Sequence, residues 1–167
     1  MTGCHGPYDD LEGAFKASQP LSGRVIPVDS VVLLSPKHNG AYNYNGVLNV
    51  RLLPSRLEIE PSGPVRIFQA NLDIPADAVS GCSRTCFGAG MWDANILISK
   101  TSTQIDFRNS SQVIDWCWAN KIPMISGKDR RQWLYSGAAL PDHSTFSEQL
   151  ASRDKYDAQA KRSCLGY

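Results

Sequence analysis

The chain has 167 residues, of which 42% are hydrophobic and 20% are charged, and its formal net charge at pH 7 is +1. This length fits one domain with a full core, and the composition is ordinary for a globular protein. The balanced charge argues against a nucleic-acid partner, which would require clustered positive charge. No apolar run reaches the roughly 18 residues of a membrane-spanning helix, so any membrane attachment has to come from a lipid.

The first residues of the sequence suggest a site at which such a lipid could be attached. Residues 2–4, Thr-Gly-Cys, resemble the end of a bacterial lipobox, in which small residues precede a cysteine that becomes acylated. This resemblance implies that Cys4 carries the lipid, that Met1 replaces a removed signal peptide, and that the protein is periplasmic and anchored to a membrane. Residues 5–23 mix glycine, proline and charge without periodicity, so we place a lipoprotein tether at residues 1–23.

Strand signals begin at Arg24, where short runs of β-branched and apolar residues start. The first runs end at Pro36. Residues 38–46 contain two Asn-Gly dipeptides, which favour turns. We therefore expect a loop here that carries Tyr42 and Tyr44.

Residues 46–60 alternate between apolar and polar side chains, which predicts a β-hairpin that turns at Pro54-Ser55. In this hairpin Glu58 and Glu60 are expected to face outward. Further strands are predicted at 65–74, 91–99 and 103–108.

The hydrophobic period changes after the last of these strands. Apolar side chains at i, i+4 spacing predict an amphipathic helix that is capped by Ser110 or Ser111 and ends near Asn120 because of Pro123. The fold class that follows is mainly β (α+β), with about seven short strands closed by one helix. Beyond it, residues 125–167 form a C-terminal extension with a short helix predicted at about 147–161, which could cover the domain or serve as a partner surface.

The middle of the chain resembles a known family. Residues 46–50 and 56–59 are similar to a hairpin motif of GRAM and other pleckstrin-homology (PH)-like domains, and residues 74–79 are similar to the step between the two sheets of those domains. The resemblance covers about residues 24–122. It implies a small orthogonal β-barrel or sandwich that is closed by the C-terminal helix, and we place this PH-like domain at 24–124. The tether, the cysteines and the tail lie outside the family pattern.

With Cys4 set aside, four cysteines remain, and an even number in an exported protein predicts two disulfides. We expect Cys82 to pair with Cys86 and Cys117 with Cys164, which would tie the tail to the domain. The two other pairings stay open, as does a buried unpaired Cys117 with a free thiol at Cys164. A zinc site is not expected, because Cys82 and Cys86 are separated by three residues rather than two and no histidine lies near them.

No catalytic motif stands out. The three histidines, His5, His38 and His143, all fall in predicted loops or termini. The consecutive residues 142–144 (Asp-His-Ser) cannot converge in triad geometry. Neither a nucleophile elbow nor a phosphate-binding loop is present. We therefore predict no enzymatic activity, no cofactor and no metal.

Exposed Trp, Tyr and Arg side chains often carry the binding energy at protein interfaces, and they supply our candidates for partner binding. The candidates are Tyr42, Tyr44, Trp92, Arg130, Arg131, Trp133 and Tyr135. Residues 130–133 form either a recognition strip or a solvated turn with an anchoring tryptophan. Inositol phosphate recognition is not expected, because the loop at 36–45 offers only Lys37 and His38 as basic groups.

These observations favour a lipid-anchored periplasmic protein without enzymatic activity that binds another protein of the cell envelope. An inhibitor or immunity protein against a secreted toxin or cell-wall hydrolase is a specific version of this hypothesis. The alternative is a GRAM/PH-like module that binds membrane lipids, in which Cys4 is unmodified and the cysteines are reduced.

Overall fold

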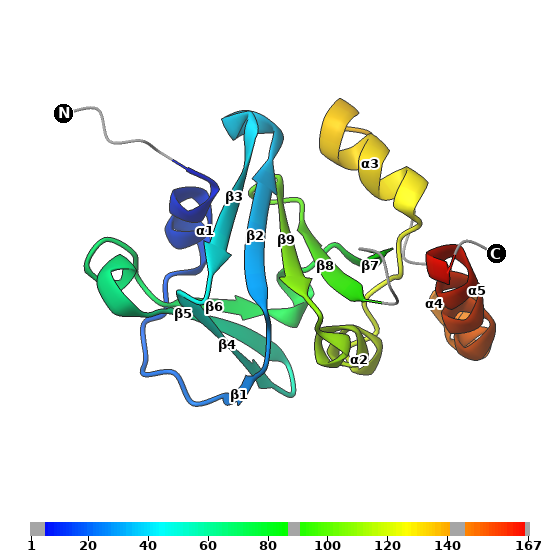
Figure 1. The fold of residues 1–167 in the computed structure, drawn as a ribbon, viewed down its shortest axis with the longest axis horizontal. Helices are drawn as coiled ribbons and strands as arrows, with labels where there is room; N and C mark the ends of the chain where they lie inside the picture. The colour runs from blue at the N-terminus through cyan, green and yellow to red at the C-terminus, as the bar shows by residue number, and fades with distance from the viewer. Residues whose placement is uncertain (1–5, 87–90, 141–145, 166–167) are drawn as a thin grey trace.

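The computed structural model describes residues 6–86, 91–140 and 146–165, which form two antiparallel sheets and five α-helices (Figure 1). The strands are β1 (Arg24–Ile26), β2 (Ser30–Ser35), β3 (Gly40–Asn45), β4 (Leu48–Leu53), β5 (Arg56–Pro61), β6 (Leu72–Pro75), β7 (Gly81–Cys86), β8 (Trp92–Ile98) and β9 (Thr103–Arg108). The α-helices are α1 (Pro7–Phe15), α2 (Ser111–Ala119), α3 (Gly127–Ser136), α4 (Phe146–Ala151) and α5 (Arg153–Leu165). Short 3-10 turns lie at η1 (Pro36–His38), η2 (Gly63–Ile67) and η3 (Ala76–Ala78).

One sheet has four strands in the order β1-β4-β5-β6, and the other has five in the order β3-β2-β9-β8-β7. The prediction of a mainly β fold is confirmed, and the hairpin β4–β5 and the helix α2 lie where the sequence pattern placed them. The barrel form of the prediction is wrong, because the sheets do not close on each other. The arrangement is compatible with an α+β sandwich and has nine strands in place of about seven.

The hydrophobic core lies between the inner faces of the two sheets. The alternation of side chains along each strand sends every second residue into this core. The five-stranded sheet contributes Val31, Leu33, Ala94, Ile96, Ile98, Ile105 and Phe107, and the four-stranded sheet contributes Val50, Leu57, Ile59, Leu72 and Ile74. All of these side chains are fully buried.

Helix α1 closes one end of the sandwich and contacts β6 and β2. Its side chains Tyr8, Leu11 and Phe15 are buried in the core. The Tyr8 hydroxyl donates a hydrogen bond to the Ala70 carbonyl at 2.7 Å, and the Ala70 amide donates one to the Glu12 carboxylate at 3.1 Å. Residues 7–15, which we expected to lie in a tether, are therefore a packed part of the domain.

Helix α2 closes the other end and joins the two sheets. Its apolar face packs on β7 and β8, while the Trp116 indole donates a hydrogen bond to the Leu53 carbonyl at 2.9 Å. The Asn120 amide donates to the Pro54 carbonyl at 2.8 Å. The turn of the β4–β5 hairpin is therefore held directly by the helix.

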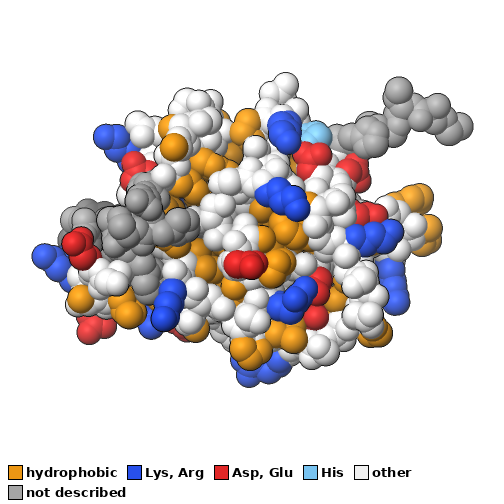
Figure 2. Space-filling model, turned by 180° about the vertical axis from the view of Figure 1, so that it is seen from behind, with side chains coloured by type: hydrophobic (Ala, Val, Ile, Leu, Met, Phe, Trp, Pro, Cys, Tyr) orange, Lys and Arg blue, Asp and Glu red, His pale blue; other side chains and the backbone are white. Residues whose placement is uncertain are grey.

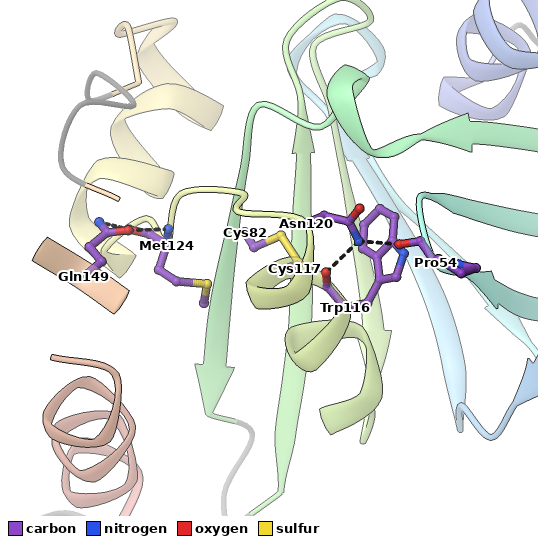
Figure 3. The surroundings of a disulfide bond; sticks show 7 residues. All are labelled: Pro54, Cys82, Trp116, Cys117, Asn120, Met124 and Gln149. Carbon is purple, nitrogen blue, oxygen red and sulfur yellow. Dashed lines mark hydrogen bonds between the residues drawn. A yellow bond between two sulfur atoms is a disulfide. The ribbon is translucent and has the colours of Figure 1, made fainter. Parts of the chain in front are cut away.

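A disulfide joins Cys82 of β7 to Cys117 of α2 across 35 residues of sequence, with an S–S distance of 2.00 Å (Figure 3). The expected pairs Cys82–Cys86 and Cys117–Cys164 are therefore wrong, because α2 packs its Cys117 face on β7 rather than on the tail. The bond also removes Cys82 as a zinc ligand. Cys86 is disulfide-bonded as well, whereas Cys4 and the Cys164 side chain lie outside the described part of the structure.

The backbone of Cys82 carries a further connection. Its amide donates to the Pro123 carbonyl at 2.9 Å, and its carbonyl accepts from the Ile125 amide, so residues 123–125 pair with the edge of the sheet. Gly81 makes this pairing possible, since a Cβ atom there would lie 2.5 Å from the Ile125 Cγ1 atom.

Several elements differ from the sequence-based expectations. Residues 40–45 form strand β3, which pairs with β2, rather than a loop. The strand predicted at 65–74 begins with the 3-10 turn η2 and becomes β6 only at Leu72. Glu58 is buried rather than outward-facing, because its carboxylate accepts hydrogen bonds from the amides of Ser22 and Gly23 where the chain folds back over the sheet.

The C-terminal extension packs on the domain. The helix predicted at 147–161 is divided into α4 and α5, and α3 precedes them. The Gln149 side-chain amide forms two hydrogen bonds of 2.9 Å with the backbone of Met124 (Figure 3). Ion pairs from Arg153 to Asp115 at 2.8 Å and from Arg84 to Asp157 at 3.1 Å attach α5 to α2 and β7.

The disulfide provides the first prediction. The double variant Cys82→Ala/Cys117→Ala is expected to lower the free energy of unfolding by about 4 kcal/mol, because a cross-link over a loop of this length reduces the entropy of the unfolded chain. Urea unfolding monitored by tryptophan fluorescence measures the change. A decrease below about 1 kcal/mol would contradict the expected contribution.

Candidate binding groove beneath helix α3

Helix α3 lies on the outer face of the five-stranded sheet, opposite the main core (Figure 1). The Ser126 hydroxyl caps its start by accepting a hydrogen bond from the Asp129 amide at 3.1 Å. Gly137, with φ of 66°, ends it in a left-handed conformation. Trp133 and Leu134 attach the helix to the sheet, because they are buried in a small second hydrophobic core. This second core contains Leu97, Ile125, Trp133 and Leu134.

A groove of about 410 Å³ runs between α3 and the end of the β2–β3 hairpin. Leu34, Pro36 and Ala41 line it from the hairpin side, and Leu134 and Tyr135 line it from the helix. Most of this surface is apolar, so the groove suits the apolar part of a bound group.

A second hollow of about 200 Å³ lies next to the groove and shares Leu34, Leu134 and Tyr135 with it. Its polar lining consists of Thr85, Asp93, Gln104, Asp106, Arg108, Arg130 and Arg131. The groove and the hollow together therefore form one continuous surface with an apolar half and a charged half, which we call the α3 groove.

Asp106 is at the centre of a hydrogen-bond network in the charged half. Its Oδ1 atom accepts hydrogen bonds from the side-chain amides of Asn95 and Gln104, both at 2.7 Å. The Thr85 hydroxyl donates a hydrogen bond to the side-chain Oδ1 atom of Asn95 at 2.8 Å, and this bond orients the Asn95 side-chain amide. Burial raises the pKa of Asp106 to about 6, although the two amide donors oppose the shift.

Two polar atoms around this network lack hydrogen-bond partners within the described residues. One is the Oε1 atom of Gln104, whose side chain is fully buried, and the other is the Nε atom of Arg130. Burial lowers the pKa of Arg130, while the nearby Asp106 opposes this shift. Among the described residues Arg130 takes part in no ion pair, although its side chain lines the hollow.

A second carboxylate, Asp93, lies beside Arg108, with the closest oxygen and nitrogen atoms 3.9 Å apart. Burial raises the pKa of Asp93, and the Arg108 charge partly offsets the effect. The hollow thus contains three arginines and two carboxylates. This arrangement favours a ligand group that accepts hydrogen bonds from arginine and carries negative charge or an amide.

The structure brings three of the sequence-predicted binding residues together. Arg130, Arg131 and Tyr135 line the α3 groove, and Tyr135 is 76% exposed. Trp133 comes from the same helix but is buried beneath it. Residues 130–133 therefore act partly as a lining and partly as an anchor.

The other candidates lie elsewhere. Tyr44 packs on Tyr8, with ring centroids 5.9 Å apart, and Tyr42 lies on the exposed edge strand β3. Trp92, at the start of β8, packs against the Arg84 guanidinium at 5.9 Å. None of these three lines the α3 groove.

Of the three histidines, only His38 lies within the described residues. The His38 Nε2 atom lies 2.9 Å from an Asp10 oxygen and links η1 to α1. His5 and His143 lie outside the described residues. The described residues also contain no cluster of His, Cys, Asp and Glu that could hold a metal ion.

Sequence reasoning did not identify Asn95, Gln104 and Asp106. Their signal is the placement of polar residues at alternate positions of the otherwise apolar strands β8 and β9, where Asn95 lies directly opposite Asp106. Polar side chains on one face of a central strand indicate that this face is either exposed to solvent or covered by another element. Here α3 lies over this face.

Comparison with protein-family models finds no family that matches this chain, and comparison with curated proteins finds no matching relative. Among the described residues, no helix combines the length and the apolar character needed to cross a membrane.

The Asp106 network predicts a pH-dependent stability. The pKa of Asp106 is higher in the folded state than the usual value near 3.9 of an unfolded chain, so the folded protein binds this proton more tightly. The resulting contribution is fully present below about pH 4 and is lost as the pH rises through about 6. In the Asp106→Asn variant this loss, on the order of 2 kcal/mol, should disappear.

Urea unfolding of the wild type and of Asp106→Asn at about pH 4.5 and about pH 7.5 tests this dependence. Replacement of the exposed Asp77 by asparagine is the matched control and should leave the wild-type dependence unchanged. Equal pH dependence in wild type and Asp106→Asn would contradict the role given to Asp106.

Proposed function

We propose that this protein is a lipid-anchored, non-enzymatic protein of the bacterial cell envelope that binds another protein through the α3 groove. The observation that carries the proposal is the position of Arg130, Arg131 and Tyr135. These three side chains line one surface, and Tyr135 is largely exposed although the neighbouring Trp133 and Leu134 are buried. Exposed tyrosine and arginine beside an apolar groove are typical of the central contacts of protein interfaces.

The chemistry of the groove suggests the kind of partner surface. An acidic or amide side chain of the partner would accept hydrogen bonds from Arg130 and Arg131, while an apolar neighbour would cover Tyr135. Buried, hydrogen-bonded charge pairs of this kind contribute strongly to specificity. The inhibitor or immunity-protein version of the proposal fits this mode, since such proteins act by occupying a partner's surface.

The disulfides support export. A buried disulfide between Cys82 and Cys117, with a second disulfide bond at Cys86, is typical of proteins that fold in an oxidising compartment. The lipobox-like residues 2–4 then provide the proposed attachment to the membrane. The proposed location is therefore the periplasm, with Cys4 as the acylated residue.

We further propose that the fold is a diverged PH-like sandwich. The β4–β5 hairpin contains the residues of the family-like motif, and α2 follows the last strand and closes one end of the core. The alternative lipid-binding function gains no support from residues 36–45, since His38 is engaged by Asp10 and residues 40–45 belong to β3.

Affinity capture from the native envelope and culture fluid, with mass-spectrometric identification, tests the partner surface. The wild type and the exposed-site control Lys155→Glu should recover the same protein in stoichiometric amount. The Arg131→Glu/Tyr135→Ala variant should recover roughly tenfold less of it, because it reverses one charge and removes the exposed aromatic ring. Equal recovery by all three forms would place the interface elsewhere.

The anchor has a separate test. Protein purified from bacterial membranes after expression behind a lipoprotein signal peptide should carry the mass of a diacylglyceryl group on the peptide that contains Cys4. The Cys4→Ser variant should lack this mass and should be recovered in the soluble periplasmic fraction. An unmodified Cys4 in the membrane-derived protein would refute the proposed anchoring.

A further inference from the structure

The end of the turn η2 and its C-cap residue Phe68 present two adjacent hydrophobic side chains to solvent. Ile67 is 80% exposed and Phe68 is 82% exposed, which are the highest values among the large hydrophobic residues of the described structure. Arg66 precedes them in the same turn. Seen from behind, the end of the molecule that carries α1 and η2 shows hydrophobic side chains projecting at its margin, with basic side chains nearby (Figure 2).

This exposed tip is held in place by hydrogen bonds. The amides of Phe68 and Gln69 both donate to the Val65 carbonyl, at 3.0 and 3.1 Å. The next residue, Ala70, is bonded through its carbonyl to the Tyr8 hydroxyl and through its amide to Glu12. The two apolar side chains are therefore presented by a braced turn that is fastened to α1.

The position of the tip relates it to the proposed anchor. Cys4 precedes Pro7 by three residues, so their Cα atoms are at most about 11 Å apart whatever the chain conformation. Tyr8, in the first turn of α1, is bonded to the residue two places beyond Phe68. Helix α1 and η2 lie at one end of the molecule, whereas α3, α4 and α5 lie at the other (Figure 1).

We propose that Ile67 and Phe68 insert into the boundary between the headgroups and acyl chains of a bilayer, with Arg66 beside anionic headgroups. A bilayer accepts a convex tip with two apolar side chains, as interfacial membrane contacts do. A stable protein interface buries about 1,200 Å² or more, which a two-residue tip cannot supply alone. With this tip in the bilayer, the α3 groove faces away from the membrane. This orientation rests on the proposed anchor at Cys4, whereas the insertion of the tip does not.

Vesicle flotation of the non-acylated full chain tests the insertion directly. The wild type should bind vesicles of phosphatidylethanolamine and phosphatidylglycerol. The partition coefficient of the Ile67→Ser/Phe68→Ser variant should be lower by roughly tenfold or more. The matched control is Val25→Ser, which removes an apolar side chain that is 51% exposed on β1. It should bind as the wild type does.

Absence of wild-type binding, or equal binding by the wild type and the double variant, would overturn the proposal. Because this assay uses protein without an acyl chain, its result is independent of the mass analysis of Cys4 and of the capture experiment. If the protein binds vesicles but Cys4 is unmodified, the insertion of Ile67 and Phe68 is supported and the anchor at Cys4 is refuted.

Photo-crosslinking identifies what the tip touches in native membranes. With p-benzoylphenylalanine in place of Phe68, the expected adduct is a lipid, detected by its mass on the peptide that contains position 68. The same replacement at Tyr135, on α3, should give no lipid adduct. A protein adduct at position 68, without lipid, would overturn the proposal in favour of a protein contact.

Discussion

The attachment of Cys82 is the constraint on which the rest of the C-terminal half depends. Its sulfur is bonded to Cys117 of α2, while its amide and carbonyl bind Pro123 and Ile125. Cys82 of β7 thus holds α2 against the inner face of the five-stranded sheet. It also holds residues 123–125, which lead to α3, at the edge of that sheet. Because Gln149 binds the neighbouring Met124, the same point also positions α4. The α3 groove exists only because this connection delivers α3 to the outer face of the sheet.

Alternating hydrophobic residues allowed the β4–β5 hairpin and the strands β8 and β9 to be predicted, because each of these strands buries one face in the core. Strand β3 was missed because the Asn-Gly dipeptides at 39–40 and 45–46, which favour turns, outweighed the alternation of Tyr and Asn between them. Its pairing with β2 decides its structure. Helix α3 was missed because only Trp133 and Leu134 are buried, although Ser126, Asp129 and Gly137 mark its ends.

The candidate site could be predicted only in part. Arg130, Arg131 and Tyr135 could be selected from the sequence because arginine and tyrosine often occur at protein interfaces, and this selection requires only the residue type. Asp106 and Gln104 could not be selected in this way, because their role depends on α3 covering strands that precede it by some twenty residues or more. The separation of Trp133 from Tyr135, one buried and one exposed, likewise follows from the docking of the helix rather than from its sequence alone.

The burial of α1 in the core has a consequence for any lipid at Cys4. With Tyr8 already fixed inside the domain, only the few residues between Cys4 and Pro7 could connect a lipid to the fold, whereas a free tether would offer all of residues 5–23. The domain would sit against the membrane, and its own length would set the height at which the α3 groove meets other molecules. Such a short connection would confine the groove to a thin layer above the bilayer, where its effective concentration would be high toward partners in that layer and close to zero toward more distant ones.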